Sequence, residues 1–354
     1  MTKDFIRRLG IDHPLLLAPM AGETAKPALA IAVSNAGALG ALGGAYMAPQ
    51  TLREAIRAIR AGTQRPFHIN LFAPTSWTAD PAKMAAYREE LGQAHATLGL
   101  AGPDLPNSYE ESFEAQFAVV LEEVPPVFST TFGALAPDRV AALKSRGILV
   151  LGTATTVAEA RALAQTGVDA IIAQGAEAGG HRGSFLASVE HSLVGTMALV
   201  PQIVSAVNLP VIAAGGIGDG RGIAAALCLG ASAVALGTSF LLADEMALSP
   251  GYKALLQSEQ AENTALTRAF SGRHARGIRN AFLDRLAGRD DIIPDFPVAN
   301  AMSKAMRGAA SKAGQTDYQS LWAGQAARLA RPEPAAAIIA RLLAEARQAL
   351  QTGL

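Results

Sequence analysis

The chain has 354 residues, of which 50% are hydrophobic and 17% are charged, so it can bury a large core and is not intrinsically disordered. Lysine plus arginine and aspartate plus glutamate each total 30, and this zero net charge argues against a nucleic-acid or polyanion partner. The single cysteine, Cys228, excludes an internal disulfide framework and a cysteine-cluster metal site.

Short apolar runs alternate with segments of helical character along the first two thirds of the chain. The runs are continuously apolar, as is typical of strands that are buried on both faces. Eight such β-α units predict a (β/α)8 TIM barrel, ahead of an open doubly wound sheet. The runs span residues 15–20, 38–44, 67–72, 127–132, 148–154, 170–175, 210–217 and 233–241.

Targeting and membrane signals are weak. The apolar run at residues 15–17 is too short for the core of a signal peptide, so a cytoplasmic location is expected. Residues 222–243 carry no charge and are long enough to span a bilayer. The sequence LGAS at 229–232 divides them into a helix-like half and a strand-like half, which favours a buried α/β core and no membrane partner.

Two parts of the chain go beyond a plain barrel. Residues 75–126 form a long insertion after the third strand, and residues 244–354 follow the eighth. We therefore predict a barrel domain over residues 1–243, with the insertion, and a mainly helical lobe over 244–354 on the substrate side. The lobe ends in an amphipathic helix at 335–350, whose apolar face is compatible with a homodimer.

Glycine-rich turns follow the last two strands. Gly215 and Gly216 allow a tight turn and close approach of the backbone to a ligand, and Asp219 can cap the next helix. The start of that helix, with bare glycine N–H groups, is a candidate anion site. Gly237 and Thr238 offer further N–H groups and a hydroxyl. Phosphates commonly bind to these two loops of a barrel, so the pair predicts a phosphorylated ligand. Either loop alone would indicate only a turn.

The sixth strand leads into the sequence QGAEAGGHRG. Gln174 and His181 lie there at the carboxyl end of a barrel strand, where barrel enzymes keep their chemistry, and Gly179 and Gly180 free the adjacent backbone. Histidine suits a general base because it titrates near neutral pH. A structural histidine that is hydrogen-bonded to the loop backbone is the alternative. No metal-ligand spacing accompanies His181, so no metal is expected.

Several motifs, in this order, resemble class I of the nitronate monooxygenase family, formerly called 2-nitropropane dioxygenase. The barrel motifs are PLLLAPMAG, SNAGALGALGG, FHINLFAP, QGAEAGGHRG, AAGGIGDGRG and ALGTSFL, and TRAFSGRHARGIRN and SLWAGQ extend the match beyond the eighth strand. The resemblance implies non-covalently bound FMN and oxidation of alkyl nitronates, such as propionate 3-nitronate, by O2. The products would be a carbonyl compound plus nitrite and nitrate, as in nitroalkane detoxification.

The resemblance also implies roles for individual residues. His181 would remove the α-proton of a neutral nitroalkane or orient a nitronate. Met20 would pack against the flavin ring, and Asn70 and Gln174 would hydrogen-bond the ring or the ribityl chain. Residues 296–300 (FPVAN) lack the tyrosine and glutamine of close relatives, so substrate size or affinity is expected to differ if they line the pocket. The implied cofactor-binding residues are Met20, Asn70, Gln174, Gly179, Gly180, Gly215, Gly216, Leu236, Gly237 and Thr238.

Two other functions stay open. An FMN-dependent NAD(P)H reductase acting on a quinone or an enoyl-acyl-carrier protein would share the glycine turns, and reduction of the flavin by NADH would identify it. A non-catalytic flavin- or phosphate-ligand-binding protein would show no activity that depends on His181.

Six arginines crowd residues 268–289. One of them could meet a substrate carboxylate, since arginine pairs well with carboxylates and phosphates. Ion pairing between the lobes and a solvated face is the favoured interpretation. The six are Arg268, Arg273, Arg276, Arg279, Arg285 and Arg289.

Overall fold

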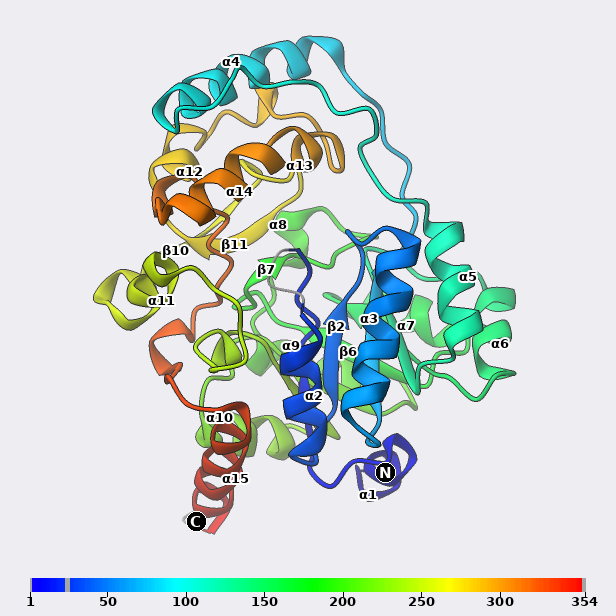
Figure 1. Cartoon of the computed structure of the whole chain (residues 1–354). Helices are drawn as coiled ribbons and strands as arrows, with labels where there is room; N and C mark the ends of the chain where they lie inside the picture. The colour runs from blue at the N-terminus through cyan, green and yellow to red at the C-terminus, as the bar shows by residue number, and fades with distance from the viewer. Residues whose placement is uncertain (1, 23–25, 352–354) are drawn as a thin grey trace.

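A computed structural model describes residues 2–22 and 26–351 (Figure 1). Eight parallel strands form one sheet in the order β1-β9-β8-β6-β5-β4-β3-β2. Parallel bridges from Leu16 to Leu39 and from Ala21 to Gly43 join the two ends of this sheet, and Leu17 N–H donates a 2.8 Å hydrogen bond to Leu39 O. The sheet therefore closes into a barrel, and the predicted TIM barrel is confirmed.

Each predicted apolar run contains one barrel strand. Continuous apolarity identified them because side chains on both faces of the sheet are buried. The strands are β1 (Leu15–Leu17), β2 (Gly40–Gly43), β3 (Phe67–Phe72), β4 (Val127–Thr131), β5 (Leu149–Ala154), β6 (Ala170–Gln174), β8 (Val211–Ala214) and β9 (Ala233–Leu236).

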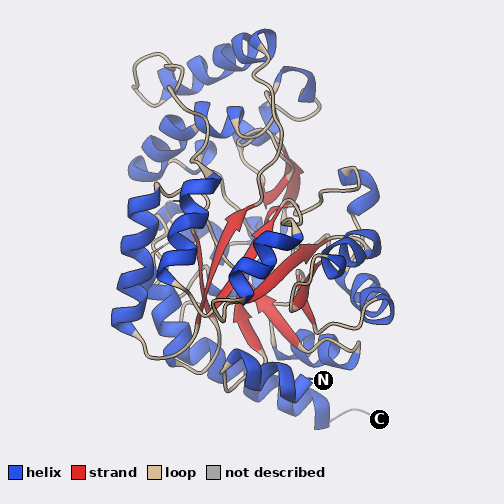
Figure 2. Cartoon of the chain, turned by 90° about the vertical axis from the view of Figure 1, so that its right-hand side faces the viewer, coloured by secondary structure: helices blue, strands red, loops and turns tan. Residues whose placement is uncertain are grey.

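Helices surround the strands (Figure 2). Several begin at a proline or at a capping side chain, as in α10, where Asp219 accepts from the N–H groups of Arg221 and Gly222. The helices around the barrel are α2 (Pro27–Asn35), α3 (Pro49–Gly62), α5 (Phe113–Glu123), α6 (Pro137–Lys144), α7 (Val157–Gln165), α9 (Thr196–Ala206), α10 (Gly220–Cys228) and α15 (Ala335–Gln351).

The last helix, α15, lies on the barrel, although the sequence favours a place in the second lobe. It packs against α10 and α2 (Figure 1). A Cβ atom on Gly220 would lie 2.3 Å from Ala346 N, so only glycine lets α15 come this close. Glu345 accepts a 2.9 Å hydrogen bond from Gly220 N–H. The apolar face of α15 is therefore used to cover the barrel wall.

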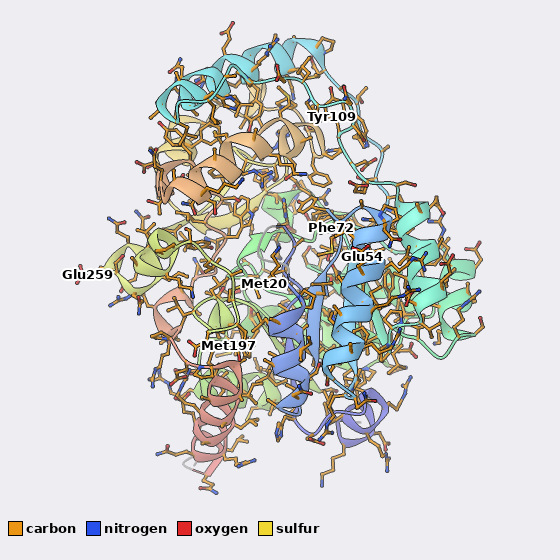
Figure 3. All side chains as sticks on the ribbon, viewed as in Figure 1. Met20, Glu54, Phe72, Tyr109, Met197 and Glu259 are labelled. Atoms are coloured by element: carbon orange, nitrogen blue, oxygen red, sulfur yellow. The ribbon has the colours of Figure 1, made fainter. Side chains whose placement is uncertain are left out.

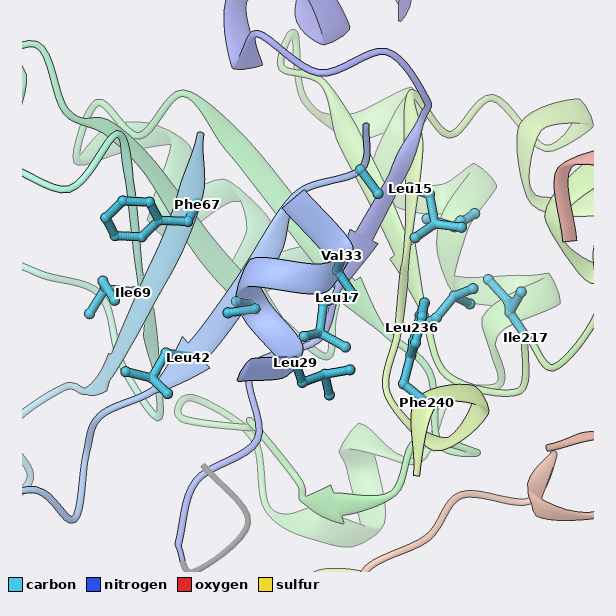
Figure 4. Close-up of a cluster of buried hydrophobic side chains, with 14 of the residues drawn as sticks. Leu15, Leu17, Leu29, Val33, Leu42, Phe67, Ile69, Ile217, Leu236 and Phe240 are labelled. Carbon is cyan, nitrogen blue, oxygen red and sulfur yellow. The ribbon is translucent and has the colours of Figure 1, made fainter. Parts of the chain in front are cut away.

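Apolar side chains fill two layers. One lies between the strands and the outer helices (Figure 4), and the other fills the barrel interior. Helix α1 (Thr2–Leu9) adds Phe5 and Leu9 to the inner layer, so it closes the end of the barrel opposite the site. Burying a side chain of this size stabilises the fold by about 1.5–3 kcal/mol.

A separate apolar cluster lies above the barrel mouth (Figure 1). We call the helices that form it the cap: α4 (Pro81–Thr97), α12 (Ala281–Arg285), α13 (Val298–Met302) and α14 (Lys304–Ala313). Tyr87 on α4 donates a 2.6 Å hydrogen bond to Ala269 O, and Glu90 accepts one of 2.7 Å from Arg289. The insertion after β3 thus supplies one wall of the cap.

A small antiparallel sheet links the barrel to the cap. Its order is β10-β11-β7, and β7 comes from the loop after β6. Apart from short 3-10 helices, the other described strands and helices are β7 (Gly180–His181), β10 (Thr264–Thr267), β11 (Ala275–Ile278), α8 (Val189–Ser192) and α11 (Pro250–Gln257).

Within residues 2–22 and 26–351, no helix has the length and apolarity that crossing a membrane requires. The uncharged stretch at 222–243 contains α10 and β9, as expected from its sequence.

The burial of His68 leads us to expect that the fold loses stability in acid. It is fully buried on β3, and burial lowers its pKa from 6.5 to about 3. The folded chain thus binds fewer protons than the unfolded chain below pH 6.5. Stability is complete above that value and falls as the pH drops from 6.5 towards 3. Urea unfolding across this range should show the fall, and His68→Gln should make it shallower. If the free energy of unfolding of His68→Gln depended on pH as steeply as that of the unaltered protein, His68 would not be the cause of the fall.

Candidate active site at the barrel mouth

The two predicted phosphate loops lie side by side. They follow β8 and β9, which pair in the sheet, and Ser239 Oγ in one loop donates a 3.4 Å hydrogen bond to Ile217 O in the other. Gly215 and Gly216 have φ angles of 100° and 70°, values that favour glycine. The sequence therefore identified two turns that the fold joins into one surface.

Loop amides, and not the start of α10, are the available anion donors. Asp219 and Glu345 already accept hydrogen bonds from the first N–H groups of α10, contrary to the expectation of bare donors there. The backbone N–H groups of Ile217, Gly218 and Thr238 donate to no described residue. Unpaired amides in adjacent loops fit a phosphate group.

The segment at 322–325 crosses directly over the loop that follows β6. A Cβ atom on Gly179 would lie 2.4 Å from Gly324 N, and one on Gly324 would lie 2.7 Å from Glu177 O. Gly324 N–H donates to Thr238 Oγ1 at 3.0 Å. Gly179 is thus required for contact between two backbones, a different reason from the expected approach to a ligand.

Gln174 shapes the loop that carries His181. Its Nε2 donates to His181 O at 3.0 Å, and its Oε1 accepts from Gly183 N at 2.8 Å. Arg182 donates to Gln174 O and Gly175 O at 2.6 and 2.7 Å, and burial lowers the pKa of this guanidinium to about 10. The side chains of Gln174 and Arg182 therefore fix the backbone at the end of β6.

Three further predicted cofactor residues differ in their placement. Asn70 on β3 donates from Nδ2 to Ser129 Oγ at 2.7 Å, whereas its Oδ1 has no hydrogen-bond partner among the described residues. Met20 follows β1, and Figure 3 shows it with Phe72 at the level of the mouth, below the cap. Leu236 is different, because its side chain lies in the outer core layer, away from the other residues.

His181 lies on β7, opposite Ala275 of β11. Its Nε2 is 2.9 Å from Ser271 Oγ. Burial, and then the positive charges of Arg273 and Arg307, lower the pKa of His181 to about 3. The imidazole is therefore neutral across the physiological pH range.

Aromatic side chains enclose the His181 ring on several sides. The sequence did not single them out individually, although two of them end predicted strands and one belongs to the segment at 296–300. Their ring centroids lie 5.5–6.0 Å from that of the imidazole. The four rings are those of Phe72, Phe132, Phe296 and Trp322.

Phe132 is held in a strained backbone conformation at the end of β4. Its φ angle is 78°, which a bulky residue rarely adopts. The guanidinium of Arg273 lies 3.9 Å from the centre of its ring, and Arg273 also donates to Ser184 O. This cation–π contact clamps the ring against His181.

The arginine cluster divides into two groups. Arg285 and Arg289 form ion pairs with Glu90 of the insertion, in line with the favoured interpretation of pairing between lobes. Arg268 and Arg279 instead pair with carboxylates of their own part of the chain, beyond residue 243. Arg273 and Arg276 are different, since they donate to backbone carbonyls beside the site. The described part of the chain holds no group of three or more histidine, cysteine, aspartate or glutamate side chains suited to a metal.

Comparison with known proteins gives one consistent family. The family model described as nitronate monooxygenase matches residues 4–345. A nitronate monooxygenase from Pseudomonas aeruginosa is 44% identical over 351 residues, covering 98% of this chain and 100% of that protein. A probable nitronate monooxygenase from Staphylococcus aureus is 38% identical over 344 residues, covering 97% of each.

Two solved structures share the fold over nearly the whole chain. The structure of a nitroalkane oxidase from Streptomyces ansochromogenes is similar with a TM-score of 0.90 and 37% identity, covering 98% of this chain and 99% of that one. FabK from Thermotoga maritima is similar with a TM-score of 0.78 and 31% identity, covering 98% and 97% of the two chains.

The backbone crossing at Gly179 makes a prediction about stability. Gly179→Ala would push the 322–325 segment away and should lower the free energy of unfolding by about 1–3 kcal/mol. Gly92→Ala is the matched control, because its Cβ would meet nothing within 4 Å and α4 should gain about 0.5–1 kcal/mol. Urea denaturation measures the free energy of unfolding of each variant. Equal changes in the two variants would contradict a close contact between the backbones at Gly179 and Gly324.

Proposed function

The chain belongs to the nitronate monooxygenase family, and from this premise we propose that it binds FMN and uses O2 to oxidise alkyl nitronates. The substrates would be of the propionate 3-nitronate type. The products would be a carbonyl compound plus nitrite and nitrate, and no reduced nicotinamide would be consumed.

The charge around His181 is the observation that carries this proposal. The imidazole is neutral, while the guanidinium groups of Arg273 and Arg307 are close enough to lower its pKa. The surroundings are otherwise aromatic, and electrostatic interactions are strong where water is excluded. A small anion with an apolar carbon end, such as an alkyl nitronate, would suit these surroundings.

The loops after β8 and β9 fit the phosphate of FMN. The N–H groups of Ile217, Gly218 and Thr238 would donate to it, and Asn70 Oδ1 would accept from the ring or the ribityl chain. Met20 at the end of β1 would lie against the ring. When bound, FMN would supply the electron transfer between the nitronate and O2.

The chain's own side chains would orient the substrate. His181 would contact the nitro group or the α-carbon, because it is the polar ring at the centre of the aromatic pocket. Phe132 and Phe296 would exclude water from the reacting carbon. The cap and the β10-β11-β7 sheet would form the substrate side of the site.

A flavin-dependent NAD(P)H reductase is the second candidate, since it would hold FMN in the same loops after β8 and β9. The glycine loops suit either reaction, so the geometry of the phosphate site does not separate them. The electron donor does separate them, because a reductase would take electrons from NADH.

Oxygen uptake by the flavin-loaded protein tests the proposed function. With propionate 3-nitronate and no NADH, we expect rapid uptake and formation of nitrite. His181→Asn should lower kcat/KM at least about tenfold, because the side chain that orients the substrate is lost. His191→Asn is the matched control, since His191 is exposed on α8. Flavin reduction by NADH without oxidation of the nitronate would favour the reductase. A bound flavin with neither activity would favour a binding protein.

A further inference from the structure

Ser271 makes three contacts that together determine where the hydrogens lie. Its Oγ is 2.9 Å from His181 Nε2 and 2.9 Å from Arg273 O, and it accepts from Arg273 N–H at 3.3 Å. A hydroxyl has one hydrogen, and a carbonyl oxygen can only accept. The Ser271 hydrogen must therefore point to Arg273 O, which requires His181 Nε2 to carry a hydrogen and donate it to Ser271.

The hydroxyl is held firmly in this position. Ser271 is 1% exposed and lies in a tight turn, where Gly272 N–H donates to Arg268 O at 2.8 Å. Gly272 has a φ angle of 80°, and a Cβ atom there would lie 2.2 Å from Pro294 O. The turn is thus packed against the segment that leads to the cap, and Ser271 has little freedom to rotate away.

The other ring nitrogen of His181 is left bare. No described residue makes a hydrogen bond to Nδ1. Besides Ser271, the groups near the ring are four aromatic side chains and the guanidinium groups of Arg273 and Arg307. A neutral imidazole carries one hydrogen, so a hydrogen on Nε2 leaves a lone pair on Nδ1. That lone pair can accept a proton but cannot donate a hydrogen bond.

We propose that Ser271 is a positioning residue that holds His181 as the Nε2–H tautomer and presents Nδ1 as a base to the α-carbon of a neutral nitroalkane. This inference rests on the proposed function. In the step, the α C–H bond breaks and the proton moves to Nδ1. The electron pair of that bond moves into the nitro group, which becomes a nitronate. The imidazolium later releases the proton to water, and no oxidant or reductant is consumed.

With the hydrogen on Nδ1 instead of Nε2, His181 could not take a proton from the substrate. If Ser271 donated to Nε2, the contact with Arg273 O would be lost and Nδ1–H would face the substrate. His181 could then only donate a hydrogen bond to a nitronate that arrives already ionised. The position of one hydrogen therefore separates a protein that generates nitronate from one that only consumes it.

Nitrogen NMR of histidine-labelled, flavin-loaded protein tests the tautomer directly. We expect His181, identified by its loss in His181→Asn, to show a protonated Nε2 and a bare Nδ1. Ser271→Ala should shift the ring towards a mixture of tautomers, Ser271→Thr should restore the original state, and Ser145→Ala, at an exposed position, should change nothing. A protonated Nδ1 in the unaltered protein would overturn the proposal. The result does not depend on turnover, so it stands apart from failure of the proposed function.

Kinetics with nitroethane and ethyl nitronate tests the consequence. Both have the same carbon skeleton, but only nitroethane needs a base. Ser271→Ala should lower kcat/KM for nitroethane about tenfold or more relative to ethyl nitronate, because a histidine in the wrong tautomer cannot accept the proton. Ser271→Thr should restore the ratio. An equal loss on both substrates would indicate a merely structural role, and no turnover of nitroethane by the unaltered protein would overturn proton abstraction.

Discussion

The site depends on the contact between two backbones where Gly179 lies against Gly324, with no side chain between them. This contact holds the loop after β6 under the 322–325 segment, which is in turn joined by a hydrogen bond to Thr238 in the loop after β9. The same loop then adds β7 to the edge of β11. His181 is therefore positioned by main-chain contacts that link the barrel to the residues beyond β9. Its imidazole ring adds a hydrogen bond to Ser271 and contacts with the surrounding aromatic rings.

Two guanidinium groups at the mouth of the barrel, those of Arg182 and Arg273, form no ion pair with a described carboxylate. Arg182 and Arg273 donate mainly to backbone carbonyls, which satisfy their hydrogens without cancelling their charges. Burial lowers the pKa of each to about 10, so both remain charged at neutral pH. A carbonyl is a dipole, and its field falls with distance more steeply than that of a carboxylate. The carboxylates of Glu159 and Glu177 act on these cations from a distance without forming an ion pair with them. Beside His181 itself, the nearby charges are those of Arg273 and Arg307, which would favour an anionic ligand.

The barrel and its glycine loops were predictable because their signals are local. An apolar run reports a strand buried on both faces, and a paired glycine reports a turn, with no knowledge of the rest of the fold. The environment of His181 was not predictable in this way. Ser271 and Phe296 reach the ring from positions 90 or more residues along the chain. The resemblance to the family singles out both of their segments, but no local pattern shows that these two side chains meet His181. The place of α15 was missed for a similar reason, since Gly220 accepts it only through tertiary packing.

Under the proposed function, the charges around His181 would treat a neutral and an ionised substrate differently. An imidazolium at position 181 is disfavoured by burial and by the charges of Arg273 and Arg307, which makes Nδ1 available but a weak base. Proton abstraction becomes favourable only when the nitronate that it creates stays beside the imidazolium, because the two opposite charges then stabilise each other. A nitronate that enters already ionised would need no proton transfer. Its negative charge would be attracted at once by the guanidinium groups of Arg273 and Arg307. Under the proposed function, the same electrostatics would therefore make an ionised nitronate the easier substrate and a neutral nitroalkane the harder one.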